Sequence, residues 1–391
     1  MKIDPYKHKE RYLAWKKSVS QGIPGISAQN SEIVMNYLND MERGLNVAVA
    51  SVKGTRSYTR LNSLREKMIS FSKRFEELYG VNKITDINEE QLISFFADMK
   101  NGIIKRQDGR DYQSIATSGK IFKAFWHWHQ KISKKKGVEI PDITVDLDTR
   151  AEKPAWVYLT EREVKTLCDN AKPNYKILMM FLFDTGIRSP GELINIKVSD
   201  FYNDFKELNI RDEISKTFGR RIKLMICSDL IKEYILGKKL SPEDYVFPIT
   251  PGRTNEYLKR LAKKTFGEKV SLAGEKYSNL TMYDFRHISC CYWLPRYKSE
   301  SALKYRFGWK KSDKIHYYSE LLGMKDTISE EDMLIDLTKT EIERMLLKSE
   351  KEREILSDRI RALEEENKDF RKVKEMVLRL HGASYLKMDG I

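Results

Sequence analysis

The feature that most constrains this chain is an ordered series of basic and aromatic residues in its second half. The series consists of Arg188, Lys216, the pair Arg286 and His287, Trp309 and Tyr318. Arg188 follows a glycine that ends an apolar helical run, so the helix breaks there and the side chain can face a cleft. The segment 213–224 is predicted to form a basic β-hairpin with Lys216 near its tip. These are phosphate-binding and proton-handling groups, and the last of them is a tyrosine placed to act as a nucleophile.

In this order the segments resemble the catalytic domain of the tyrosine recombinases, also called the phage-integrase family. That family has an arginine in a Thr-Gly-x-Arg segment, a hairpin lysine, His-x-x-Arg, a Gly-His or Gly-Trp pair, and then the tyrosine. The resemblance extends over residues 159–325. The amino-acid sequences of the motif segments look most like those of archaeal integrases. One segment alone would be weak evidence, but the whole set in the right order and spacing is hard to obtain by chance.

The resemblance implies a site-specific DNA recombinase or integrase, an enzyme of mobile elements or of chromosome-dimer resolution. Such an enzyme cuts and rejoins DNA through a 3′-phosphotyrosyl link, without metal, ATP or any other cofactor. The partner implied is double-stranded DNA, on which four copies of the protein assemble as a homo-tetramer.

The catalytic residues implied by the resemblance are Tyr318, Arg188, Lys216, Tyr283, Arg286, Trp309 and His287. The two arginines would clamp the non-bridging phosphate oxygens, because a planar guanidinium holds two oxygens and keeps its charge. The Trp309 indole N–H would donate a further hydrogen bond, and Lys216 would protonate the leaving 5′-oxygen. A phenol has an ordinary pKa of ~10, and we expect the arginines to favour its phenolate form.

Two departures from the family pattern matter. Tyr283 stands where the family usually has the first histidine of His-x-x-Arg, so the individual roles of Tyr283 and His287 stay open. Glu192 follows Arg188 by four residues instead of three, which a local one-residue bulge would absorb. Tyr317 is an alternative nucleophile, but the spacing from the tryptophan and the Tyr-Ser-Glu-Leu ending favour Tyr318.

Other interpretations of these residues remain. A type IB topoisomerase shares much of this chemistry but acts as a monomer and only relaxes supercoils. A DNA-binding factor could keep the fold and have weakened catalysis. Taken singly, Arg188 would more often form an ion pair with Glu192, Lys216 would be one of many solvated lysines, and the aromatic residues would belong to a core.

Composition agrees with a polyanionic partner. The 391 residues include 71 Lys and Arg against 57 Asp and Glu, a net charge of +14, although a generally lysine-rich proteome would explain much of this excess. The four cysteines show no metal-ligand spacing and are predicted to be reduced core thiols. The longest apolar run, 177–183, is far too short to span a bilayer, so we expect a soluble, cytoplasmic, nucleoid-associated protein without membrane contact.

We predict a mostly α-helical fold with a small β-sheet, divided into five parts. These are a basic N-terminal arm (1–29), a helical core-binding domain that contacts DNA (30–135), a linker (136–158), the catalytic domain (159–325) and a C-terminal helical tail (326–391). The second part should hold four helices, at 31–43, 58–79, 88–99 and 114–135, although a generic bundle gives the same pattern. A capping box formed by Thr160 and Glu163 should begin the first catalytic helix.

The tail has a different pattern. From about 336 to 380 the sequence favours a long charged helix. Its apolar residues fall on alternating three- and four-residue steps, with Asn367 among the polar interruptions. We expect either a coiled coil, with Asn367 fixing its register, or an amphipathic helix folded back on its own catalytic domain.

Overall fold

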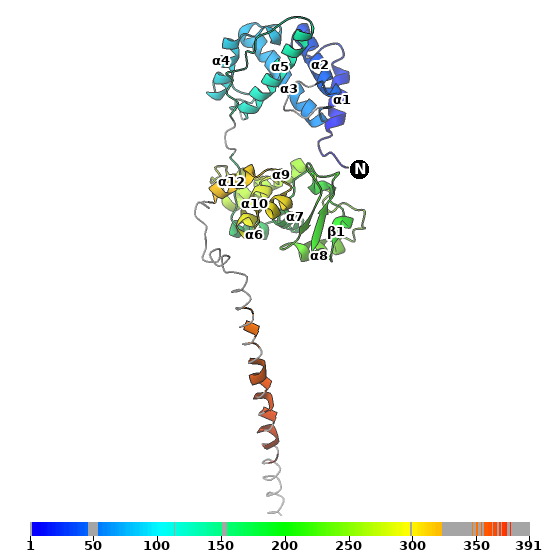
Figure 1. The fold of residues 1–391 in the computed structure, drawn as a ribbon, viewed down its shortest axis with the longest axis vertical. Helices are drawn as coiled ribbons and strands as arrows, with labels where there is room; N and C mark the ends of the chain where they lie inside the picture. Colours follow the sequence, from blue (N-terminus) through cyan, green and yellow to red (C-terminus); the bar gives the residue numbers. More distant parts are fainter. Residues whose placement is uncertain are drawn as a thin grey trace, which may run out of the picture. The chain divides into compact units, whose positions relative to one another are not determined.

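The computed structural model describes residues 2–45, 54–112, 114–150, 155–297 and 299–322, and part of the residues between 346 and 376. This described part of the chain is mostly helical with a small three-stranded sheet, which confirms the predicted fold class (Figure 1). Among these described residues no helix is both long enough and apolar enough to cross a membrane.

The N-terminal part is built of helices, and all but the first lie close to their predicted positions. They are α1 (His8–Ser18), α2 (Ala28–Arg43), α3 (Tyr58–Tyr79), α4 (Glu89–Lys100) and α5 (Ile115–Lys135), with a short 3-10 turn η1 (Ile84–Asp86) before α4. Helix α3 begins after Ser57, whose side chain accepts a hydrogen bond from the Arg60 N–H, and ends at Gly80 in the left-handed conformation. The four predicted helices are therefore present, with ends shifted by at most three residues.

The predicted basic N-terminal arm (1–29) contains helix α1. This helix is densely charged and buries only one side chain, so its apolar residues show no helical period. The buried residue is Tyr12, which is part of the same core as residues of α3 and packs at 5.8 Å from the Tyr58 ring. One aromatic anchor thus places α1 in the bundle.

Aromatic rings fill the core of this bundle. Phe75 meets Phe95 edge to face at 4.9 Å between ring centres, and Phe71 meets Phe122 in the same way at 5.5 Å. Edge-to-face pairs of this kind contribute roughly 0.5–1.5 kcal/mol each beyond the area they bury. Trp126 and Trp128 of α5 are also buried.

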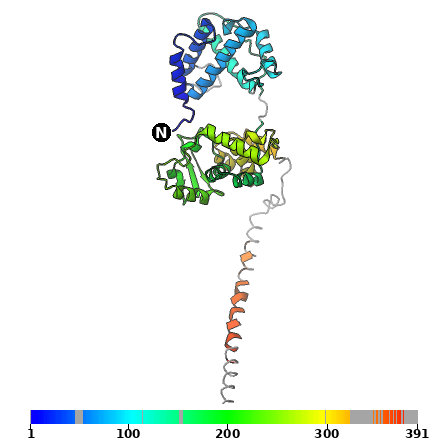
Figure 2. The same ribbon diagram turned by 180° about the vertical axis from the view of Figure 1, so that it is seen from behind.

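The second part of the chain surrounds a three-stranded antiparallel sheet in the order β1-β2-β3. Its strands are β1 (Phe201–Tyr202), β2 (Glu207–Ile210) and β3 (Arg220–Lys223). Its helices are α6 (Glu161–Asp169), α7 (Pro173–Thr185), α8 (Ser228–Gly237), α9 (Pro251–Phe266), α10 (Asp284–Trp293), α11 (Glu300–Phe307) and α12 (Asp313–Leu321), with short turns η2 (Leu193–Asn195), η3 (Val198–Asp200), η4 (Tyr277–Asn279) and η5 (Leu294–Arg296). Figures 1 and 2 show α6, α7, α9, α10 and α12 gathered to one side of the strands.

Two local predictions can be compared with these elements. The capping box of Thr160 and Glu163 begins α6 as expected. The predicted hairpin is present, but it begins before the predicted segment 213–224. Its first strand is β2, which ends at Ile210 and pairs with β3. Lys216 therefore lies in the loop 211–219 between these two strands.

Candidate active site

Arg188 owes its position to the sharp end of α7. That helix stops at Gly186 in the left-handed conformation, where an added Cβ would lie 2.3 Å from the Phe307 ring. The chain then turns through a cis Ser189–Pro190 peptide. The Arg188 guanidinium donates to the Glu192 carboxylate at 2.8 Å and to the Gly308 carbonyl at 2.9 Å. Glu192 thus reaches Arg188 although it is one residue further along than in the family pattern.

Arg286 reaches the same region from α10. Its guanidinium is buried and donates to the carbonyl oxygens of Gly186, at 2.6 Å, and Phe307. The charge also lies 5.8 Å from the centre of the Trp309 ring. Burial, and then the charge of Arg188, lower the pKa of Arg286 to about 10. The two predicted arginines are therefore neighbours, and Arg286 remains charged at neutral pH despite its burial.

A buried carboxylate supports this cationic pair. Glu192 binds Arg188 on one side and Arg220, from β3, on the other, with two hydrogen bonds of 3.1 and 2.9 Å to Arg220. Burial alone would raise the pKa of Glu192, but the hydrogen bonds and charge of Arg220, and then those of Arg188, lower it to about 2. The expected ion pair between Arg188 and Glu192 is thus present, and it fixes an arginine whose side chain is still 18% exposed.

A second buried ion pair holds the surrounding elements together. Asp184, near the end of α7, binds Arg306 of α11 at 2.8 Å. The same carboxylate accepts three backbone N–H groups from residues 225–227, just after β3. Because both charges are fully enclosed, removal of either would leave the other unpaired in the interior.

Tyr318 lies at the centre of this region. Its side chain is only 2% exposed, its hydroxyl is hydrogen-bonded to Nδ1 of His287, and its ring stacks on Trp309 with 5.9 Å between centres. Burial, and then the neighbouring Cys290 and Cys291, raise the pKa of Tyr318, and the opposing effect of Arg286 is smaller. Arg286 thus favours the phenolate, as expected, but burial outweighs its effect in this state and keeps the pKa of Tyr318 above its ordinary value.

Trp156 is a site residue that the sequence did not reveal. It was placed in the linker, but it is buried and stacks on His287 at 4.8 Å. Its indole N–H donates to the hydroxyl of Tyr317 at 2.7 Å. The two adjacent tyrosines therefore have different partners, a histidine for Tyr318 and a tryptophan for Tyr317. A lone tryptophan just before the first catalytic helix was the available signal.

The two remaining predicted residues lie at the solvent-exposed edge of the site. Tyr283 is 51% exposed, and its ring meets His287 edge to face at 5.2 Å. Lys216 is exposed in the loop 211–219, but its neighbour Thr217 bonds the Gly308 carbonyl at 2.9 Å. Five of the seven predicted residues are thus joined by direct contacts, and Arg188 and Lys216 are linked to them through Gly308 and Thr217.

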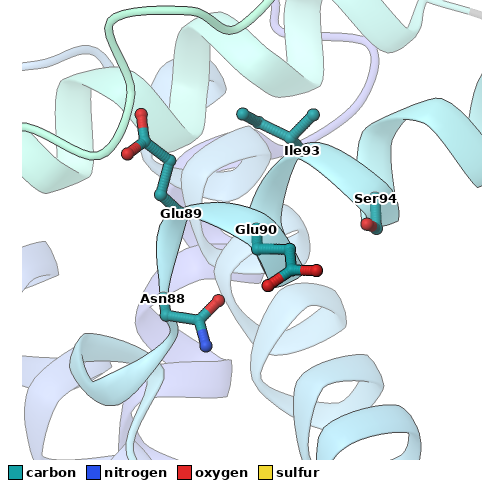
Figure 3. Close-up of a pocket in the computed structure, with 5 residues that line it drawn as sticks. All are labelled: Asn88, Glu89, Glu90, Ile93 and Ser94. Carbon is teal, nitrogen blue, oxygen red and sulfur yellow. The ribbon is translucent and has the colours of Figure 1, made fainter.

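A hollow at the start of α4 is acidic, unlike the cationic region around the two arginines. Figure 3 shows that it is lined by Asn88, Glu89, Glu90, Ile93 and Ser94. Its two carboxylates would repel a phosphate, and it holds none of the predicted catalytic residues. The region around Arg188 and Arg286, by contrast, combines fixed positive charge with the tyrosine hydroxyl of Tyr318, which is the arrangement that attack on a phosphodiester would require.

Comparisons with known proteins agree with this geometry. Residues 157–323 match the model of the phage integrase family. No curated protein sequence matches the chain.

Two solved structures have a similar fold. The integrase of the Tn1549 transposon in complex with transposon right end DNA is 14% identical, with 81% of this chain and 99% of that chain covered and a TM-score of 0.54. A lambda integrase dimer bound to a COC′ core site is 17% identical, with 78% and 81% covered and a TM-score of 0.53. At these identities the similarity is one of fold alone, and none of it supports the expected likeness to archaeal integrases.

Proposed function

We propose that this protein is a site-specific DNA recombinase that cuts and rejoins double-stranded DNA through a 3′-phosphotyrosyl link to Tyr318. The observation that carries the proposal is the convergence of Tyr318, His287 and Trp309 beside the charged Arg286. The phage integrase family domain over residues 157–323 supports it, and so do neighbouring folds that were solved on DNA.

In the proposed reaction the phosphate is held by Arg188 and Arg286. A guanidinium offers two parallel donors to the non-bridging oxygens and stabilises the additional negative charge of the phosphorane. Buried neighbours restrain both side chains, so they lose little freedom when DNA binds. The Trp309 N–H supplies a further donor.

The proton of the nucleophile passes to His287. The Tyr318 hydroxyl is hydrogen-bonded to Nδ1 of this residue, and the exposed Tyr283 does not offer an imidazole at the usual position of the family. In this chain His287 therefore acts as the base. The phenolate oxygen bonds to phosphorus, the bond to the 5′-oxygen breaks, and Lys216 donates a proton to that oxygen. The energy of the broken bond is kept in the phosphotyrosyl link, so the reverse step needs neither ATP nor metal.

Burial of Tyr318 adds a condition to this reaction. Because Tyr318 is only 2% exposed, its hydroxyl cannot reach a phosphate in this state. DNA binding must therefore bring the Tyr318 ring out of its packing on Trp309. Tyr318 belongs to the short helix α12, whose movement is the simplest way to do so. Until then the nucleophile stays neutral and protected from water.

The assembly and setting follow from the same proposal. Four copies act on two duplexes, the bundle of α1 to α5 forms the core-binding domain, and residues 136–158 link it to the catalytic domain. The protein acts in the cytoplasm at the nucleoid. Likeness to archaeal integrases stays a prediction.

Strand exchange between two marked duplexes tests the proposed function. Binding sites are first selected by affinity from a random-sequence duplex library and are then placed on two fragments with different labels. We expect recombinant fragments that carry both labels, and none with Tyr318→Phe. Relaxation of a supercoiled plasmid without recombinants would contradict a recombinase and favour a type IB topoisomerase.

A further inference from the structure

The C-terminal unit, Ser319–Ile391, carries a stripe of apolar side chains that face solvent. Its described residues between 346 and 376 are helical. The tail stripe consists of Leu346, Leu356, Ile360, Leu363, Asn367 and Phe370. Its five apolar members are each more than half exposed; Phe370, for example, is 68% exposed. Apolar stripes along a helix are stable when another surface covers them.

The spacing of the tail stripe fits a coiled-coil partner. Together with Ser349 and Arg353, its members fall on alternating steps of three and four residues, the repeat that keeps one stripe against a second helix. Ile360 and Asn367 occupy the first apolar position of the heptad, and Leu356 and Leu363 occupy the second. Ile in the first position with Leu in the second favours two strands when the helices are parallel.

The polar members of the repeat indicate which partner this is. Against an arbitrary apolar surface, the Asn367 amide would lose its hydrogen bonds to water without replacement, at a cost of roughly 1–3 kcal/mol. Facing the same residue of a second copy, the two amides can bond to each other. Arg353 can extend its charge past the edge of a two-stranded pair but would be enclosed in a larger bundle.

Charged residues that flank the tail stripe indicate whether the two helices run parallel or antiparallel. When the two helices are parallel, Arg359 faces Glu364 of the second copy, and Glu364 faces the second Arg359, so both contacts are attractive. Glu366 and Arg371 have the same five-residue spacing in the sequence, so the parallel arrangement pairs these two opposite charges as well. If the helices are antiparallel, the register that sets Leu356 against the second Ile360 brings two Arg359 side chains together. It also sets Glu350 against Glu364.

We propose that the tail stripe is the interface of a parallel two-stranded coiled coil between two copies of this chain. The dimer forms without DNA, so protomers reach their target in pairs. This inference does not depend on the proposed reaction, because it concerns the solution state of the protein alone.

Sedimentation equilibrium of the full chain in the absence of DNA tests the dimer. We expect twice the monomer mass for the natural protein and the monomer mass for Leu363→Lys. The matched control is Glu365→Lys, two residues away on the outer face of the helix, which should stay dimeric. Leu363 is 56% exposed, so its replacement leaves the fold of each copy unchanged. A monomeric natural protein, or a Leu363→Lys variant as dimeric as the control, would overturn the interface.

A disulfide tests the direction. In a parallel pair Asn367→Cys places two thiols face to face, and mild oxidation should give a covalent dimer. In the antiparallel register the same thiols would lie roughly 27 Å apart along the helix, at 1.5 Å per residue. The native cysteines are buried and do not compete. A dimer that Asn367→Cys fails to cross-link would contradict the parallel arrangement.

Discussion

At the scale of single residues, the most consequential feature is that the Tyr318 hydroxyl is buried and neutral. Burial raises its pKa, and its hydroxyl is bonded to His287. An unprotected phenolate beside two arginines would be exposed to side reactions in the absence of DNA. Activation therefore needs two events, exposure of the ring and transfer of its proton.

Replacing His287 should expose its role as the base. We expect His287→Ala to slow formation of the covalent DNA adduct by roughly 10²-fold or more, the usual contribution of a general base. Added imidazole should restore part of the rate, because it can accept the same proton. The measurement is the rate of adduct formation on a nicked duplex.

Tyr283→Phe is the control for this experiment. It keeps the ring that meets His287 and removes only the hydroxyl, so the rate should be nearly unchanged. If Tyr283→Phe were as slow as His287→Ala, or if imidazole gave no recovery, proton transfer would not run through His287.

The buried carboxylate allows a prediction on stability. Glu192→Gln should lower the free energy of unfolding by roughly 3–5 kcal/mol, because it leaves Arg220 enclosed without its counter-charge. Glu213→Gln, at an ion pair on the surface, should cost about 1 kcal/mol or less. Urea unfolding near neutral pH measures both, and equal losses would contradict the role of Glu192.

The same residue gives a pH dependence. Its pKa of about 2 in the folded protein lies below the ordinary value of ~4.3, so the ionised form is favoured by folding. This contribution, about 3 kcal/mol, is complete above the unfolded pKa and is lost as the pH falls toward 2. The stability gap between the natural protein and Glu192→Gln should therefore narrow below about pH 4. A gap that stays constant down to pH 2 would contradict it.

Several site residues could be predicted from the sequence because they stand in short segments with a fixed order. Arg188, Arg286 and Trp309 are of this kind. Trp156 and Arg220 could not, since each acts through contacts with residues that are distant in the sequence. The raised pKa of Tyr318 could not be predicted for a related reason, because sequence reveals nearby charge but not the degree of burial.

At the scale of elements, the loop 211–219 is tied to the site at Thr217 and exposed at the preceding residue, Lys216. Thr217 bonds the Gly308 carbonyl, which also accepts from Arg188. The loop can therefore move Lys216 while its attachment to the site is kept. Helix α1 shows the limits of pattern reading at this scale, because one buried tyrosine in a charged helix leaves no period to detect.

The proposed role of Lys216 can be tested through the leaving group. Lys216→Ala should slow cleavage of an ordinary phosphodiester by roughly 10²–10⁴-fold. A substrate in which sulfur replaces the bridging 5′-oxygen needs no proton, since a thiolate is stable near neutral pH. The variant should then cleave it nearly as fast as the natural protein. A variant slow on both substrates would show that Lys216 serves another purpose.

At the scale of the whole molecule, the net charge of +14 agrees with binding along a DNA backbone. The fold class could be predicted because long helical patterns dominate the sequence. The assembly of four copies stays a prediction, because it depends on surfaces that meet only between chains.

Salt provides the test of backbone binding. Each neutralised phosphate releases a counterion, so a protein with 6–10 such contacts should lose roughly 10³–10⁵ in affinity between 50 and 200 mM salt. Fluorescence anisotropy of a labelled duplex measures this slope. Binding that hardly changes with salt would rule out extensive contact with the phosphates.

The central claim is that the Tyr318 hydroxyl attacks the DNA backbone, and covalent capture tests it most directly. A nicked duplex carrying a selected site is incubated with the protein, and adducts that resist detergent are digested and located by mass spectrometry. The DNA should be attached at Tyr318. Tyr318→Phe should form no adduct while binding duplex normally, and Tyr317→Phe should still form it. An adduct at Tyr317, or one that survives in Tyr318→Phe, would contradict the account.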